Sequence, residues 1–108
     1  MKLNMQNMLQ QAQKMQQELE KVKTEISQRT VTADSGGGMV IVTAKGNHQI
    51  LSIKINKEIV NPDDIEMLED LVVAGVNKAF QAAQLLADEE FGKVSSLLPN
   101  LPGLDLNL

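Results

Sequence analysis

The segment 30–56, TVTADSGGGMVIVTAKGNHQILSIKIN, decides the fold of this chain. It contains three runs that are rich in β-branched residues, as strands are, at 30–33, 39–44 and 49–56. Two turn signals separate these runs, the triple glycine at 36–38 and the sequence Lys-Gly-Asn-His at 45–48. The last run alternates apolar with polar residues, which gives it one apolar face. The segment therefore predicts a three-stranded antiparallel meander whose apolar face is covered by another element.

The segment before the sheet, residues 1–28, predicts one long helix. Its apolar residues recur at steps of three and four, the spacing of a coiled-coil seam; they are Met5, Met8, Ala12, Met15, Leu19, Val22 and Ile26. Such a helix would be roughly 37 Å long, whereas a compact domain of this size has a radius of gyration of about 13 Å. We therefore expect an arm that projects from the body or lies along a partner. Its seam would consist mainly of Met5, Met8, Met15, Leu19 and Val22.

Residues 61–91 predict a second helix. Asn61 and Pro62 suit its first positions, the former as an N-cap and the latter through its fixed φ angle. The apolar stripe is wider than a seam, so we expect this helix to pack on the sheet. The residues expected in that packing or in a dimer interface, on the helix and on the last strand, are Leu68, Leu71, Val72, Gly75, Ala79, Ile53 and Ile55. The small residues around Gly75 permit either a helix lying flat on the sheet or close packing across a two-fold axis.

Residues 92–108 form a tail that is rich in leucine and contains Pro99 and Pro102. Its leucines fit either docking onto the body or a neighbour, or a frayed end. Together the four segments predict a single α+β domain over residues 1–108, in the order α-β-β-β-α. The apolar runs are far shorter than the roughly 20 residues of a membrane span, and the N-terminus lacks the hydrophobic region of a secretion signal. We therefore expect a cytoplasmic protein without a membrane partner.

The composition excludes several kinds of chemistry. The chain has no Cys and a single His, His48, so cysteine nucleophiles, thiolate sites and histidine-rich metal sites are excluded. Two Phe and no Tyr or Trp are too few aromatic rings for a base-stacking surface. Helix capping accounts for Asp63 and Asp64, and a solvated helix face accounts for the cluster Asp88, Glu89 and Glu90. A strand rather than a helix follows the triple glycine, unlike in a phosphate-binding loop. We expect no catalytic residue, metal, cofactor or small-molecule substrate, and hence no enzyme.

The charge is distributed unevenly along the chain. Residues 1–57 carry eight Lys and Arg against four Asp and Glu, a net charge of +4, whereas residues 58–108 carry −8. A local excess of cations is what binding to DNA phosphates requires. The charge-based candidates for DNA contacts are Lys14, Lys21, Lys23, Arg29, Lys45 and Lys54. On the first helix their spacing predicts one cationic face, with Lys23 beside the others; ion pairs with neighbouring glutamates are the alternative explanation for the same cations.

Four stretches carry a family resemblance: MLQQAQKMQ at 8–16, GGGMV at 36–40, MLEDLVVAGVNKA at 67–79 and LPGL at 101–104. In their order and spacing, which extend over nearly the whole chain, the sequence resembles the YbaB/EbfC family of bacterial nucleoid-associated proteins. Gly75 departs from the family, which more often has Ala there. The resemblance implies a homodimer of α-β-β-β-α protomers whose long first helices project as paired arms. It also implies binding to double-stranded DNA with low sequence specificity, in the cytoplasm on the nucleoid.

Two functions fit the sequence. In the first, the homodimer binds the phosphate backbone of double-stranded DNA along its arms and so affects nucleoid organisation, DNA protection and gene expression. In the second, the methionines of the seam, which adapt to varied apolar surfaces, hold a partner helix. The protein is then a protein-binding helical clamp or accessory factor that does not bind DNA directly. The first hypothesis rests on the resemblance and on the cationic half of the chain, the second on the seam.

Overall fold

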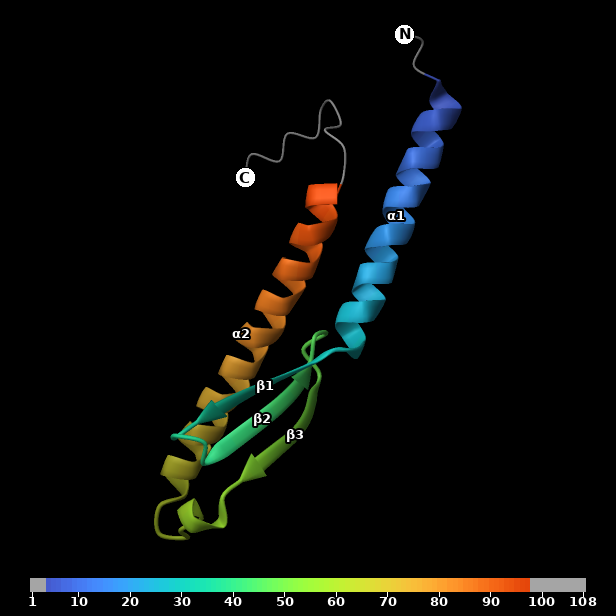
Figure 1. The fold of residues 1–108 in the computed structure, drawn as a ribbon. Helices are drawn as coiled ribbons and strands as arrows, with labels where there is room; N and C mark the ends of the chain where they lie inside the picture. The colour runs from blue at the N-terminus through green and yellow to red at the C-terminus, as the bar shows by residue number, and fades with distance from the viewer. Residues whose placement is uncertain (1–3, 98–108) are drawn as a thin grey trace.

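The computed structural model describes residues 4–97, whose elements follow the order α-β-β-β-α. The elements are helix α1 at Met5–Gln28, strands β1, β2 and β3 at Thr30–Ser35, Val40–Lys45 and Ile50–Ile55, a short 3-10 turn at Lys57–Ile59, and helix α2 at Ile65–Leu97. Figure 1 shows α2 lying on the sheet with its first half and continuing past it beside α1. The α+β architecture expected from the sequence is confirmed.

The three strands form an antiparallel sheet in the order β1-β2-β3. The central strand contributes the core, because Val40, Val42 and Ala44 have no exposed surface and alternate with residues of the opposite face. The β1–β2 turn depends on glycine, since the three glycines at 36–38 have positive φ angles of 60°, 66° and 91°. The meander predicted from the two turn signals is confirmed.

Helix α2 lies flat on the sheet because its contact face is built from small residues. Gly75 and Ala79 are buried, and a Cβ atom at Gly75 would lie only 2.9 Å from Cγ2 of Val42. The buried hydroxyl of Ser35 donates a hydrogen bond of 2.6 Å to the carbonyl of Leu71, which joins β1 to the same part of the helix. Of the two arrangements that the small residues permit, the structure adopts packing against the chain's own sheet.

The start of α2 differs from the predicted boundary at residue 61. Asn61 begins a turn rather than the helix, since its side chain accepts a hydrogen bond from the amide of Asp63 at 3.0 Å. The helix itself begins at Ile65. Asp64 caps it, because its carboxylate accepts a hydrogen bond of 3.2 Å from the amide of Met67.

The end of α2 lies at Leu97, beyond the predicted end at Phe91. Gly92 lies inside the helix and does not stop it, and nothing lies within 4 Å of a Cβ atom built on it. Val94 on the next turn is buried against α1, and this contact stabilises the added residues. The predicted tail 92–108 therefore begins later than expected, and residues 98–108 lie outside the described part of the chain.

Helices α1 and α2 run antiparallel, and α1 is held only near its base (Figure 1). A second buried cluster joins them there, formed by Val22, Ile26 and Val94 with Leu19, Ala87 and Phe91 packed around it. Toward the tip the apolar side chains are uncovered among residues 4–97: Met5, Met8 and Leu9 are 76%, 54% and 61% exposed. The projecting helical arm expected from the sequence is thus present, and α2 covers the lower half of its seam.

Candidate nucleic-acid interface

Three of the six candidate cations lie on the arm, and all three are exposed. Because an α-helix turns by about 100° per residue, Lys14 and Lys21 lie about 20° apart, on one flank of the seam. Lys23 lies about 200° from Lys21 and therefore on the other flank. The prediction that Lys23 lies beside the other two lysines is wrong. The arm has cations on both sides of its seam rather than one cationic face.

The flank of the arm that carries Lys14 and Lys21 also carries Glu18 and Glu25. The steps of four, three and four residues between these four positions place them in one row along the helix. No ion pair joins them within residues 4–97, so the lysines remain exposed cations in a row of mixed charge. Such a row attracts an anion only weakly, because each glutamate opposes its neighbouring lysine.

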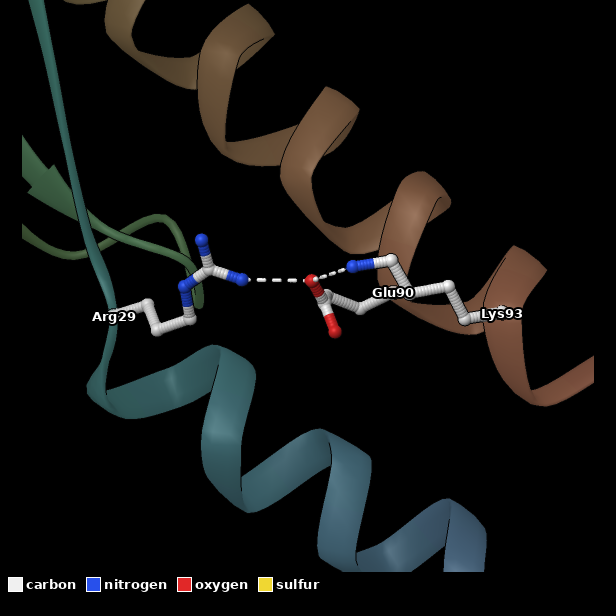
Figure 2. A network of polar contacts seen from close by, with 3 residues as sticks. All are labelled: Arg29, Glu90 and Lys93. Atoms are coloured by element: carbon white, nitrogen blue, oxygen red, sulfur yellow. Dashed lines mark hydrogen bonds and ion pairs between the residues drawn. The ribbon is translucent and has the colours of Figure 1, made fainter.

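Arg29 ends the arm and links it to α2. Its Nη1 atom lies 2.7 Å from Oε1 of Glu90, and Nζ of Lys93 lies 3.2 Å from the same oxygen (Figure 2). The hydrogen bond from Lys93 is the largest influence on Glu90. Together with the charge of Lys93 and the contact with Arg29, it outweighs burial and lowers the pKa of Glu90 below its ordinary value of 4.5. Arg29 is therefore a structural contact as much as a candidate DNA contact.

The β2–β3 turn packs against the end of α1. The amide of Gly46 donates a hydrogen bond of 2.9 Å to the carbonyl of Arg29, and a Cβ atom at Gly46 would overlap the carbonyl oxygen of Ile26. Only glycine permits this approach. We call Ile26, Arg29, Gly46 and Glu90 the arm joint, because these residues connect the base of the arm to both the sheet and α2. The joint sets the direction in which the arm leaves the body.

The other two candidate cations, Lys45 and Lys54, lie on the sheet face that α2 does not cover. Lys54 pairs with Ile41, and both Ile41 and Lys45 alternate along β2 with the buried residues that face α2. We call this surface the outer sheet face; from the strand register it consists of Thr30, Thr32, Asp34, Ile41, Thr43, Lys45, Ser52 and Lys54. It combines two cations and several hydroxyl groups with a single acid.

Ile53 and Ile55 lie on the α2 side of the sheet yet remain 39% and 38% exposed. They pair with the buried Val42 and Val40, but α2 packs chiefly over β1 and β2. Within one chain, α2 therefore leaves these two isoleucines largely uncovered, and their expected role in a dimer interface stays a prediction. The other residues expected in the packing of α2 on the sheet are buried or half-buried, namely Leu68, Leu71, Val72, Gly75 and Ala79. We call the open strip formed by Ile53 and Ile55 the β3 ledge.

Among residues 4–97, neither helix combines the length and apolar character needed to cross a membrane. In the same range no three side chains of His, Asp or Glu gather where they could hold a metal ion.

The amino-acid sequence has clear relatives. A model of the family described as the YbaB/EbfC DNA-binding family matches residues 1–98. A nucleoid-associated protein from Thermodesulfovibrio yellowstonii is 56% identical over 96 residues, which cover 89% of this chain and 83% of the relative. A nucleoid-associated protein from Alkaliphilus metalliredigens is 43% identical over 101 residues, which cover 94% of this chain and 88% of the relative.

The fold also occurs in a solved structure. The crystal structure of an uncharacterized protein from Helicobacter pylori matches with a TM-score of 0.71, and the match covers 90% of this chain and 100% of that one. The two sequences are 18% identical, so this likeness concerns the fold alone. The family match and the sequence relatives, which are named nucleoid-associated proteins, decide the identity: the chain belongs to the YbaB/EbfC DNA-binding family.

Proposed function

We propose that this chain forms a homodimer that binds double-stranded DNA with low sequence specificity, through contacts with the phosphate backbone. The observation that carries the proposal is the match to a DNA-binding family over residues 1–98, supported by relatives named nucleoid-associated proteins. The protein acts in the cytoplasm on the nucleoid, where it affects nucleoid organisation, DNA protection and gene expression. Its function involves no catalysis, metal, cofactor or small-molecule substrate, and no membrane.

Low specificity follows from the kind of cation that the two candidate surfaces offer. The candidates on the arm and on the outer sheet face are all lysines. Lys14, Lys21, Lys23 and Lys54 are exposed, and Lys45 is half-buried. Lysine is a flexible point charge, whereas reading guanine in the major groove favours the bidentate fork of arginine. Arg29, the one arginine of the chain, is held by Glu90 in the arm joint. Contacts made in this way neutralise phosphates and read little of the base sequence.

Weak, salt-sensitive binding follows from the overall charge. Each chain has a net charge of −4, so a dimer has −8, which opposes the approach of DNA at long range. The acids are concentrated in residues 58–108, which include α2, so the cationic half must face the DNA. The lysines therefore act at short range, by displacing counterions from the phosphates that they contact.

The β3 ledge supports the dimer in this proposal. Ile53 and Ile55 continue the apolar face of β2 past the edge of α2, and the outer edge of β3 has no neighbouring strand within residues 4–97. An apolar strip beside an open strand edge is costly to leave in water. A second copy of the chain covers this strip, and the two arms then project from a shared body.

Fluorescence anisotropy with labelled mixed-sequence duplex DNA, titrated at several salt concentrations, tests the DNA part. We expect log affinity to fall with log salt at a slope of about −3 to −6, because several phosphates are neutralised. The double variant K14A/K21A removes the two cations on one flank of the arm. It should weaken binding about tenfold or more and make the dependence of log affinity on log salt less steep. Its matched control is K57A/K78A, which removes two exposed cations outside both candidate surfaces.

The outcomes of this titration separate the surfaces. Equal losses in K14A/K21A and K57A/K78A would reject the arm, and a larger loss in K45A/K54A would then assign the contact to the outer sheet face. Arg29 is left unchanged, since its substitution would also loosen the arm joint. Wild-type protein that fails to bind DNA even at low salt would reject DNA binding altogether.

Sedimentation analysis tests the dimer. The variant I53K places a charge on the β3 ledge, and we expect it to shift the protein from dimer to monomer at micromolar concentration. The control I41K adds the same charge at a residue of similar exposure on the outer sheet face and should leave the dimer intact. A dimer that survives I53K would place the interface elsewhere.

The helical clamp remains the second candidate, because the tip of the arm exposes Met5, Met8 and Leu9. In this reading two arms hold an apolar partner helix, and DNA is not bound directly. The variant M5E/M8E should then abolish capture of the partner while the dimer body stays folded. For DNA binding, the same variant should leave affinity within about twofold of K57A/K78A, since it removes no cation.

A further inference from the structure

The seam of the arm is divided into a covered and an open half. The lower half packs against α2 through Val22 and Ile26. The upper half consists of Met5, Met8, Leu9, Ala12 and Met15, all exposed except the half-buried Met15; we call it the open seam. Leu9 widens the apolar stripe here, where α2 does not reach. An apolar stripe of this width on a helix is typical of a surface that packs against another segment.

The end of α2 directs the chain toward this open seam. Val94 is packed against Val22 at the arm's base, and α2 then runs one further turn to Leu97. The two helices are antiparallel (Figure 1), so that turn advances toward the tip of the arm. Because Val94 lies beside Val22, three residues of helix rise bring the end of α2 to about the level of Leu19. The chain therefore leaves α2 where the covered half of the seam ends.

We propose that residues 98–108 of the same chain pack along the open seam. This segment, LPNLPGLDLNL, has leucine at five of its eleven positions, and Pro99 and Pro102 oppose its continuing as a helix. Extended, it reaches about 36 Å at about 3.3 Å per residue. The distance along α1 from Leu19 to Met5 is about 21 Å at 1.5 Å per residue. The segment is thus long enough to follow the open seam to its tip.

The charges along the two partners are compatible with this packing. Residues 4–13 of the arm carry no charge, and Asp105 is the only charged side chain of the segment. Attachment to α2 also gives the segment a high local concentration at the seam, which a second copy or an unrelated helix lacks. The proposal does not depend on DNA binding.

Methyl NMR on the full-length chain tests the proposal in two ways. The chain has no Cys, so N107C accepts a single spin label near the end of the segment. We expect the label to broaden the methyl signals of Met5 and Met8 and to leave Met67, on the opposite end of α2 from this segment, unaffected. The second measurement uses L101S/L104S, which should shift the methyl signals of Met5, Met8 and Met15.

The controls identify the occupant of the open seam. L85S removes an exposed leucine of α2 and should leave all three methionine signals in place. A mixture of spin-labelled chains without isotope enrichment and isotopically enriched chains without the spin label reports contacts between copies. Broadening of Met5 and Met8 in that mixture would overturn the proposal and assign the seam to a neighbouring copy, because there the spin label and the observed methyl groups lie on different chains. An unbroadened Met5 and Met8 in the singly labelled chain, with no shift in L101S/L104S, would overturn it in favour of an open arm.

Discussion

Helices α1 and α2 have the same spacing of apolar residues but bury them to very different extents. In α2 the contact face contains Gly75 and Ala79, so that the helix backbone lies close to the sheet and the core residues there have no exposed surface. In α1 the corresponding positions near the tip are Met5 and Met8, which remain exposed. Small residues let a helix approach a flat sheet, whereas large flexible residues need a surface that closes around them. Spacing therefore predicts a helix, and residue size predicts what it packs on.

The most direct way to break the packing of α2 is G75V. The new Cβ atom would lie 2.9 Å from Cγ2 of Val42 and 3.4 Å from Oγ of Ser35, and two methyl groups would follow it into a filled space. We expect the free energy of unfolding to fall by about 2 to 3 kcal/mol through overpacking. Urea denaturation followed by circular dichroism measures it. A loss below about 1 kcal/mol would mean that α2 is held less closely than this distance implies.

The corresponding change at the base of the arm is I26A. Ile26 is buried in the smaller cluster between α1 and α2, so its truncation should cost about 2 kcal/mol. The matched control, L85A, truncates an exposed residue of α2 and should stay within about 0.5 kcal/mol of wild type. Urea denaturation followed by circular dichroism measures both variants. Equal effects of the two variants would show that the base of the arm does not pack stably on α2.

The elements of the fold could be predicted from local sequence, but the contacts between them could not. The triple glycine at 36–38 and the alternation in β3 determine the meander with little help from the rest of the chain. Which strands α2 covers depends on how the helix crosses the sheet, so Ile53 and Ile55 carry the pattern of core residues and yet lie at an open edge. The end of α2 depends likewise on a distant residue, because burial of Val94 by α1 outweighs the presence of Gly92.

The candidate interface was predictable only as a set of cations. Nothing in the neighbourhood of Arg29 indicates that its partner is Glu90, 61 residues away. The role of Gly46 in the arm joint is hidden for the same reason, since its close contact is with the end of another element. The position of Lys23 is different. Helical rotation alone separates it from Lys21 by about 200°, so this error could have been avoided from the sequence.

A comparison of two glycines in one helix sharpens the contrast between packed and free parts of α2. Gly92 has nothing within 4 Å of a Cβ position, whereas Gly75 has three atoms within 3.5 Å. G92A should therefore raise the free energy of unfolding by about 0.5 to 1 kcal/mol through helix propensity. G75A has the same gain in propensity but must displace Val42, so it should be less stable than G92A. Thermal or urea unfolding that ranks G75A above G92A would contradict this packing.

The smallest effect is expected for the polar part of the arm joint, in E90Q. Contacts with Lys93 and Arg29 hold the pKa of Glu90 below 4.5 in the folded protein, so these contacts stabilise the fold at any pH above its unfolded pKa. The stabilisation is lost as the pH falls through the lower, folded pKa. Wild type should thus be slightly more stable than E90Q near about pH 7, and the difference in stability should disappear once the pH lies below the folded pKa of Glu90.

Salt provides an independent check on the same ion pairs. The Arg29 and Glu90 side chains are 54% and 18% exposed, so added salt should reduce the difference between wild type and E90Q at neutral pH. The difference in the free energy of unfolding between wild type and I26A should not shrink in this way, because it arises from apolar burial, which salt does not screen. An E90Q difference that persisted at low pH and in high salt would show that Glu90 holds the arm through its shape and hydrogen bonds. The joint would then depend on packing at Ile26 and Gly46 rather than on charge.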